Sequence, residues 1–170
     1  MKLYCNKRIT EILISKGANI LDVDNEGNTG LHLASENGNF ETVKYLLNTK
    51  KCNLDIENKE QFTALHLSSI NGNLNICKLL IENGANLNCL NSRKRTPLHL
   101  ASSNGNSEIV RYLIQKGADT TIRDDKNQYE RAEEGKTALD LASESLQYHK
   151  ISKIFKESLK KKEYTKLVDK

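Results

Sequence analysis

The chain of 170 residues has no tryptophan, a single proline and no apolar run long enough to cross a membrane. A membrane-spanning helix needs about 20 consecutive apolar residues, so no such segment is expected. The N-terminal residues also lack the apolar core of a signal peptide. None of the 19 asparagines begins an Asn-x-Ser/Thr sequon, which favours an intracellular protein, cytoplasmic or nuclear, over a secreted one.

Motifs for catalysis and metal binding are also missing. The four cysteines (Cys5, Cys52, Cys77 and Cys89) form no C-x-x-C pair, and Cys77 is expected to be a small buried apolar residue. No nucleophile elbow, Walker loop or dinucleotide fingerprint occurs. Carboxylate pairs do occur within residues 124–134, but that polar segment is predicted to be a mobile loop that cannot hold acid–base geometry. We therefore expect no enzyme, no cofactor and no metal.

The positive charge is concentrated at the C-terminus. Residues 150–170 contain eight lysines and three acidic residues, a net charge of +5, so the rest of the chain carries 4 − 5 = −1. The basic character therefore belongs to a tail, and nucleic-acid binding is not the expected function.

What the sequence does have is a repeated phrase, Thr-Pro-Leu-His-Leu-Ala at residues 96–101. Close copies stand at residues 29–34 and 63–68, and a fainter one, with Asp140 in place of histidine, at 137–142. The spacing of 34, 33 and 41 residues between the threonines indicates a repeat array.

Each copy reads as two helices joined by a turn. The threonine is a good N-cap, and Pro97 fits the first helical position. In the first three copies an Asn-Gly-Asn turn ends the short helix, whereas the fourth has Ser-Leu-Gln at residues 145–147. A second run with apolar residues at helical spacing follows the turn. Gly-Ala-Asn or Gly-Ala-Asp ends the second run at residues 84–86 and 117–119.

This pattern of short helix, turn, longer helix and loop resembles the ankyrin repeat, over roughly residues 9–155. The resemblance implies an all-α fold, an α-solenoid of stacked helix-turn-helix repeats whose finger loops project to one side. It also implies that His32, His66 and His99 tie neighbouring loops together by hydrogen bonds. Three residues on successive helices about 8–10 Å apart cannot converge on one metal ion.

We predict one repeat domain over residues 1–159, followed by a basic tail over 160–170 that frays from Glu163. The domain divides into a half-repeat (1–27), repeats at 28–61, 62–94 and 95–127, a loop insertion (127–134) and an atypical capping repeat (135–159). The half-repeat leaves an apolar flank without a neighbour, so it is either an improvised cap or the continuation of a longer array. The insertion is either part of a binding face or a tolerated extension.

Ankyrin repeats usually hold partner proteins with their fingertips and with the exposed, concave side of their first helices. The matching positions here are Asn25, Glu26, Asn28, Glu36, Lys59, Glu60, Phe62, Ile70, Ser92, Arg93, Lys94, Arg95 and Ser103, with Tyr129 in the insertion. Phe62 and Ile70 are apolar where the other repeats have polar residues, so they either anchor a partner or pack locally. Residues 93–95 form a basic fingertip that could take acidic groups from a partner.

The sequence therefore predicts a monomeric, non-enzymatic module that binds a protein with an acidic or mixed apolar and acidic surface, and no small molecule. One alternative is the recognition arm of a larger enzyme or membrane protein, or a chaperone like the ankyrin-repeat factors of proteasome assembly. Another is a nucleic-acid or anionic-lipid binder that uses the basic fingertip and the lysine tail.

Overall fold

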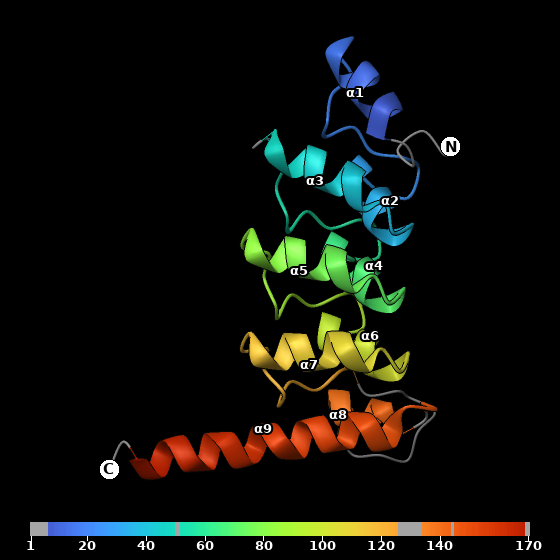
Figure 1. Ribbon diagram of the computed structural model, residues 1–170. Helices are drawn as coiled ribbons and strands as arrows, with labels where there is room; N and C mark the ends of the chain where they lie inside the picture. Colours follow the sequence, from blue (N-terminus) through green and yellow to red (C-terminus); the bar gives the residue numbers. More distant parts are fainter. Residues whose placement is uncertain (1–6, 50–51, 126–133, 144, 169–170) are drawn as a thin grey trace.

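The computed structural model describes residues 7–49, 52–125, 134–143 and 145–168, and the regular elements in these residues are helices. Helix α1 (Lys7–Ser15) is followed by four helix pairs that stack in one direction (Figure 1). The pairs are α2 (Gly30–Glu36) with α3 (Phe40–Asn48), α4 (Ala64–Ile70) with α5 (Leu74–Glu82), α6 (Pro97–Ser103) with α7 (Ser107–Gln115), and α8 (Ala138–Ala142) with α9 (Tyr148–Val168). The predicted all-α solenoid is confirmed.

The first helix of each pair begins at the predicted threonine. Thr29, Thr63, Thr96 and Thr137 all have extended backbones, and the hydroxyl of each accepts a hydrogen bond from the backbone N–H three residues later. The side chain at that third position accepts the threonine N–H in return, which completes a capping box. The repeated phrase therefore fixes where each repeat starts.

The Asn-Gly-Asn turns link successive repeats as well as successive helices. The glycines at 38, 72 and 105 have φ values of 74° to 75°, which a residue with a side chain rarely adopts. The side-chain amide of Asn73 donates to the carbonyls of Ser35 and Glu36, at the end of the preceding first helix, and Asn106 repeats this contact with Ser69 and Ile70. These bonds satisfy carbonyls that a helix end leaves without partners.

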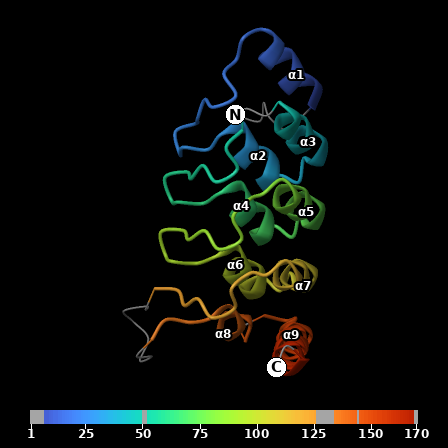
Figure 2. The same ribbon diagram turned by 90° about the vertical axis from the view of Figure 1, so that its left-hand side faces the viewer.

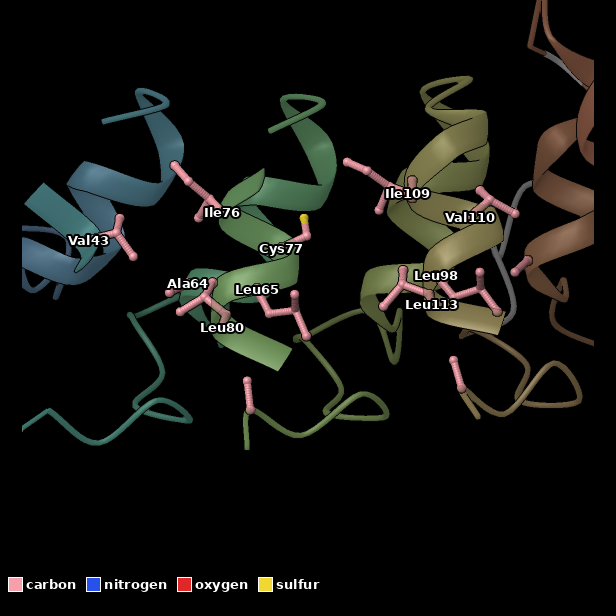
Figure 3. Packing of buried hydrophobic residues seen from close by; sticks show 14 of the residues in the cluster. Val43, Ala64, Leu65, Ile76, Cys77, Leu80, Leu98, Ile109, Val110 and Leu113 are labelled. Atoms are coloured by element: carbon pink, nitrogen blue, oxygen red, sulfur yellow. The ribbon is translucent and has the colours of Figure 1, made fainter. Parts of the chain in front are cut away.

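The hydrophobic core runs along the stack as a line of interfaces between neighbouring repeats. Figure 3 shows its side chains, which come from both rows of helices and from the loops after them. Leu65, Leu98 and Leu113 are at most 1% exposed, and Cys77 is fully buried between the rows, as predicted. At the N-terminal end of the described residues, Ile9 and Ile12 of α1 are 40% and 51% exposed.

The loops before the first helices project to one side as fingers, and the first helices lie between the fingers and the second helices (Figure 2). At the turn of the first finger Gly27 has a φ of 81°, but Gln61 and Lys94 occupy the matching positions with φ of 60° and 53°. A side chain in the left-handed region costs about 1–2 kcal/mol. Two fingers therefore carry local backbone strain.

Replacing Gln61 by glycine is expected to stabilise the protein. Relief of the left-handed strain outweighs the extra freedom that glycine gives the unfolded chain, for a net gain of about 0.5–1 kcal/mol. Urea unfolding followed by circular dichroism measures it. The neighbouring Glu60→Gly is the control and should destabilise, since φ of Glu60 is not in the left-handed region. An equal loss of stability in both variants would contradict the prediction.

Two parts of the predicted organisation are wrong. Residues 160–168 do not form a separate tail that frays from Glu163, because α9 continues to Val168 through residues that include neither glycine nor proline. In the fourth finger, both ends of the segment predicted to be a mobile loop (residues 124–134) make contacts, because Asp124 N donates to the carbonyl of Lys136 at 2.9 Å and Arg123 pairs with Glu134 at 3.3 Å. Most of the predicted insertion, including Tyr129, lies outside the described residues.

Candidate functional site

The three repeated histidines join each repeat to the next, as predicted from the resemblance. In each case Nε2 contacts a backbone carbonyl at the end of the following finger. The pairs are His32 with Phe62 at 2.9 Å, His66 with Arg95 at 3.1 Å, and His99 with Lys136 at 3.2 Å. In each ring Nδ1 accepts the N–H of the capping threonine at 3.1–3.2 Å. Nε2 must therefore carry the hydrogen, so the rings are neutral.

Burial keeps these rings uncharged. Desolvation lowers the pKa of His66 to about 4, and it also lowers the pKa values of His32 and His99. Protonation would place a hydrogen on Nδ1, where it would face the threonine N–H. The histidines are therefore structural connectors rather than acid–base groups.

Asp140 explains why the fourth repeat departs from the phrase. Its Oδ2 accepts from the backbone N–H of Thr137 at 2.9 Å and from the hydroxyl at 2.7 Å, the same role that Nδ1 has in the other repeats. A carboxylate accepts hydrogen bonds but donates none. Asp140 therefore takes the accepting role of Nδ1 at the cap but offers no donor like the Nε2–H of the three histidines.

The predicted partner-binding residues of the first two repeats meet at one hollow of about 500 Å³. It lies between the first two fingers and the C-terminal ends of α2 and α4. Its lining comprises Asn25, Glu26, Asn28, Glu36, Asn58, Lys59, Glu60, Phe62, Leu67 and Ile70. Leu67 and Asn58 had not been predicted from the sequence.

Phe62 and Ile70 are both partly buried at this hollow. The Phe62 ring packs edge-on against His66, with ring centroids 5.8 Å apart. The interpretation that Phe62 packs locally is therefore supported, and because Phe62 also lines the hollow, the interpretation that it anchors a partner stays a prediction. The structure brings together the two apolar residues that the sequence had singled out.

Asn28 was wrongly predicted to face a partner. It is only 7% exposed, because its side-chain amide donates to Asp24 at 3.2 Å and its Oδ1 accepts from Asn58 Nδ2 at 2.8 Å. Asn28 thus joins the first finger to the second. Its role is to position the wall of the hollow.

The basic fingertip is also different from the prediction. Arg95 Nε donates to Oδ2 of the buried Asp124 at 2.9 Å, and Lys94 Nζ lies 2.7 Å from Asp125. The Arg93 carbonyl accepts from the N–H of Asp125 at 3.0 Å. The acidic groups expected from a partner are thus supplied by the next finger, and the prediction that Asp124 and Asp125 are mobile is wrong.

The remaining predicted residues do not extend the site. Ser103 is partly buried, and its hydroxyl donates to the Leu100 carbonyl at 3.1 Å. Exposed lysines gather instead on α9, which projects beyond the stack (Figure 1). They are Lys150, Lys153, Lys156, Lys160 and Lys161.

Sequence reasoning missed how the fingers are held in shape. Asp24, Asn58 and Asn91 each stand five residues before a capping threonine, and the Oδ1 of each accepts backbone N–H groups two and four residues later at 2.8–3.1 Å. Asp124 takes over this position in the fourth finger and accepts the N–H of Lys136. The signal was present as an Asp or Asn at a fixed offset from the repeated phrase.

Over the described residues, no three His, Cys, Asp or Glu side chains lie close enough to hold a metal ion. The same residues include no helix with the length and apolarity needed to span a membrane.

A search of curated proteins found no match. The sequence model of ankyrin repeats (three copies) matches residues 2–91, 49–124 and 87–165. These matches together cover most of the chain, and they agree with the stacked helix pairs, the capping threonines and the histidine contacts. The chain belongs to the ankyrin-repeat family.

Proposed function

We propose that this chain is a non-enzymatic module that binds a partner protein at the hollow beside Phe62 and Ile70. Ankyrin repeats are generally protein–protein interaction modules, and the family is typically non-enzymatic. The observation that carries the proposal is that two partly exposed apolar side chains of one repeat line the same hollow. Large apolar side chains in a concave, polar-rimmed site are typical anchors of protein interfaces.

The other repeats support this choice of site. At the position of Phe62 they have Asn28 and Arg95, and at the position of Ile70 they have Glu36 and Ser103. The fold therefore tolerates polar residues at both places, and stacking alone does not require the apolar pair. The free thiols of Cys52, Cys77 and Cys89 favour an intracellular setting for the interaction.

Exchanging the apolar pair for its counterparts tests the site. The double variant Phe62→Asn, Ile70→Ser takes its residues from the first and third repeats, so it should fold. In affinity capture from lysate of the source organism, we expect the amount of bound partner to fall by about tenfold or more, because the variant lacks the buried anchor. Quantitative mass spectrometry compares the proteins recovered with wild type and variant.

The matched control is Leu146→Asn, Leu159→Ser, which removes two exposed apolar residues away from the hollow. It should recover the same proteins as the wild type, and circular dichroism should show equal helix content in all three. If the two double variants recover equal amounts of every protein, the proposed site is wrong.

A further inference from the structure

We infer that the hollow takes a partner segment in which an apolar side chain stands next to lysine or arginine. This inference rests on the proposed function, because it specifies the partner of the same site. It departs from the acidic partner that the sequence predicted, and it follows from the charges that the structure places around the hollow.

The apolar part of the segment is indicated by the lining between the fingers. Phe62 and Ile70 contribute partly exposed apolar surface, and Leu67 lies between them on α4 with 8% exposed. A hollow of about 500 Å³ has room for a large apolar side chain of a partner together with its neighbours. Burying such a side chain supplies the main attraction.

The basic part is indicated by three glutamates on the rim. Glu26 comes from the first finger, Glu36 from the end of α2 and Glu60 from the second finger, so three separate segments bring their carboxylates to one place. Lys59 is the single cation among the lining residues, so the net charge there is 1 − 3 = −2. All three glutamates are exposed, and none has a salt bridge to any residue in the described parts of the chain.

The neighbouring fingers show the opposite arrangement. Lys94 and Arg95 are paired with Asp125 and Asp124, so the charge of that fingertip is largely compensated within the chain. An acidic segment could not pair with these cations without displacing Asp124 and Asp125. At the hollow it would be repelled by the three glutamates. A basic segment gains there, since opposite charges at an interface rim speed association and select the partner.

Selection of peptides on the wild-type protein tests the inference. The probe is a library of random peptides displayed on phage, and each selected peptide is then measured by fluorescence polarisation against wild type and Phe62→Asn, Ile70→Ser. Peptides that require the apolar pair are expected to carry Lys or Arg beside a large apolar residue. Their affinity should fall as salt is raised from about 0.05 M to about 0.3 M, because exposed charges are screened.

Two charge variants then isolate the glutamates. Glu36→Gln, Glu60→Gln should weaken these peptides about three- to tenfold, the effect of two exposed charge pairs. Glu41→Gln, Glu108→Gln makes the same change in net charge in the first turns of α3 and α7, outside the hollow, and should leave affinity within about twofold.

The outcomes separate the two proposals. Peptides that require Phe62 and Ile70 but are rich in Asp and Glu, or that bind the Glu36→Gln, Glu60→Gln variant as well as wild type, overturn the basic partner and leave the site in place. If no selected peptide requires Phe62 and Ile70, both the site and this inference are wrong.

Discussion

The protein is expected to lose several kcal/mol of stability when the pH falls from about 7 to about 4.5, because its three connecting histidines are buried and neutral. The pKa of His66 is about 4 in the folded protein, against 6.5 for an ordinary histidine. A difference of one pKa unit corresponds to about 1.4 kcal/mol, so His66 alone accounts for about 3 kcal/mol by pH 4. His32 and His99 add to the loss in the same direction.

The sign follows from which state binds protons first. Below pH 6.5 the unfolded chain takes up protons on these histidines while the folded protein does not, so lowering the pH favours unfolding. The free energy of unfolding should be flat above that pH, fall between it and the folded pKa values, and level off below them. Hydrogen-bond geometry agrees, since protonated Nδ1 can no longer accept the N–H of Thr63.

Asp24 and Asp140, the two described carboxylates with clearly shifted pKa values, do not produce a loss in this window. Desolvation raises the pKa of Asp24 and of Asp140, but hydrogen bonds from Asn28 and Thr137 respectively outweigh it, and both pKa values end below 3.8. Stability from these two groups is therefore present above pH 3.8 and is lost only at lower pH. A fall between pH 6.5 and pH 4.5 is thus expected from the histidines and not from these two carboxylates.

Urea unfolding followed by circular dichroism at a series of pH values measures the effect. The control is His149→Gln, which removes an exposed histidine and should keep the same slope of stability against pH. His66→Gln should lower the free energy of unfolding at pH 7, because the Arg95 carbonyl loses its hydrogen bond from the ring. It should also make the dependence of that free energy on pH less steep, by the equivalent of about one bound proton. A wild-type stability that is equal at pH 7 and pH 5 would refute the prediction.

The parts of the fold that sequence could predict are those that each repeat specifies within its own phrase. A threonine cap, a following Leu-His-Leu and an Asn-Gly-Asn turn are local signals, and they recur in register, so each copy supports the reading of the others. Phe62 and Ile70 could be found in the same way, because they break the pattern of their sister positions. The hollow they line then follows from the stacking of adjacent repeats.

The parts that sequence could not predict depend on pairs formed between neighbouring fingers. Asn28 bonds to Asn58, but the equivalent contact in the third repeat is an ion pair between Arg95 and Asp124. Because the chemistry differs from pair to pair, no repeated signal marks it. Read alone, Asn28 and Arg95 look like exposed polar residues.

Arg95→Ala is expected to destabilise the protein by about 2–3 kcal/mol, whereas Arg93→Ala should cost less than about 0.5 kcal/mol. The Asp124 side chain is 4% exposed. Without Arg95, the side-chain hydrogen bond that its carboxylate keeps with the described residues is the one from the N–H of Lys136. Breaking a buried ion pair costs about 3–5 kcal/mol, and the 28% exposure of the Arg95 side chain places this pair below that range. Arg93 has an exposed side chain with no salt bridge to the residues described.

Thermal and urea unfolding of both variants measure the difference, and the chain itself supplies a rescue. Arg95→Asn combined with Asp124→Asn recreates the pair that Asn58 Nδ2 and Asn28 Oδ1 form at 2.8 Å between the first two fingers. The double variant should therefore recover most of the stability that Arg95→Ala loses, since no buried charge remains unpaired. If Arg93→Ala and Arg95→Ala lower the free energy of unfolding equally, the ion pair of Arg95 contributes nothing measurable, and the sequence-based prediction of an exposed basic fingertip would stand. If they differ as expected, Arg95 serves to hold the third finger to the fourth. It is then not available to the partner that we propose, whereas the exposed glutamates of the first two fingers are.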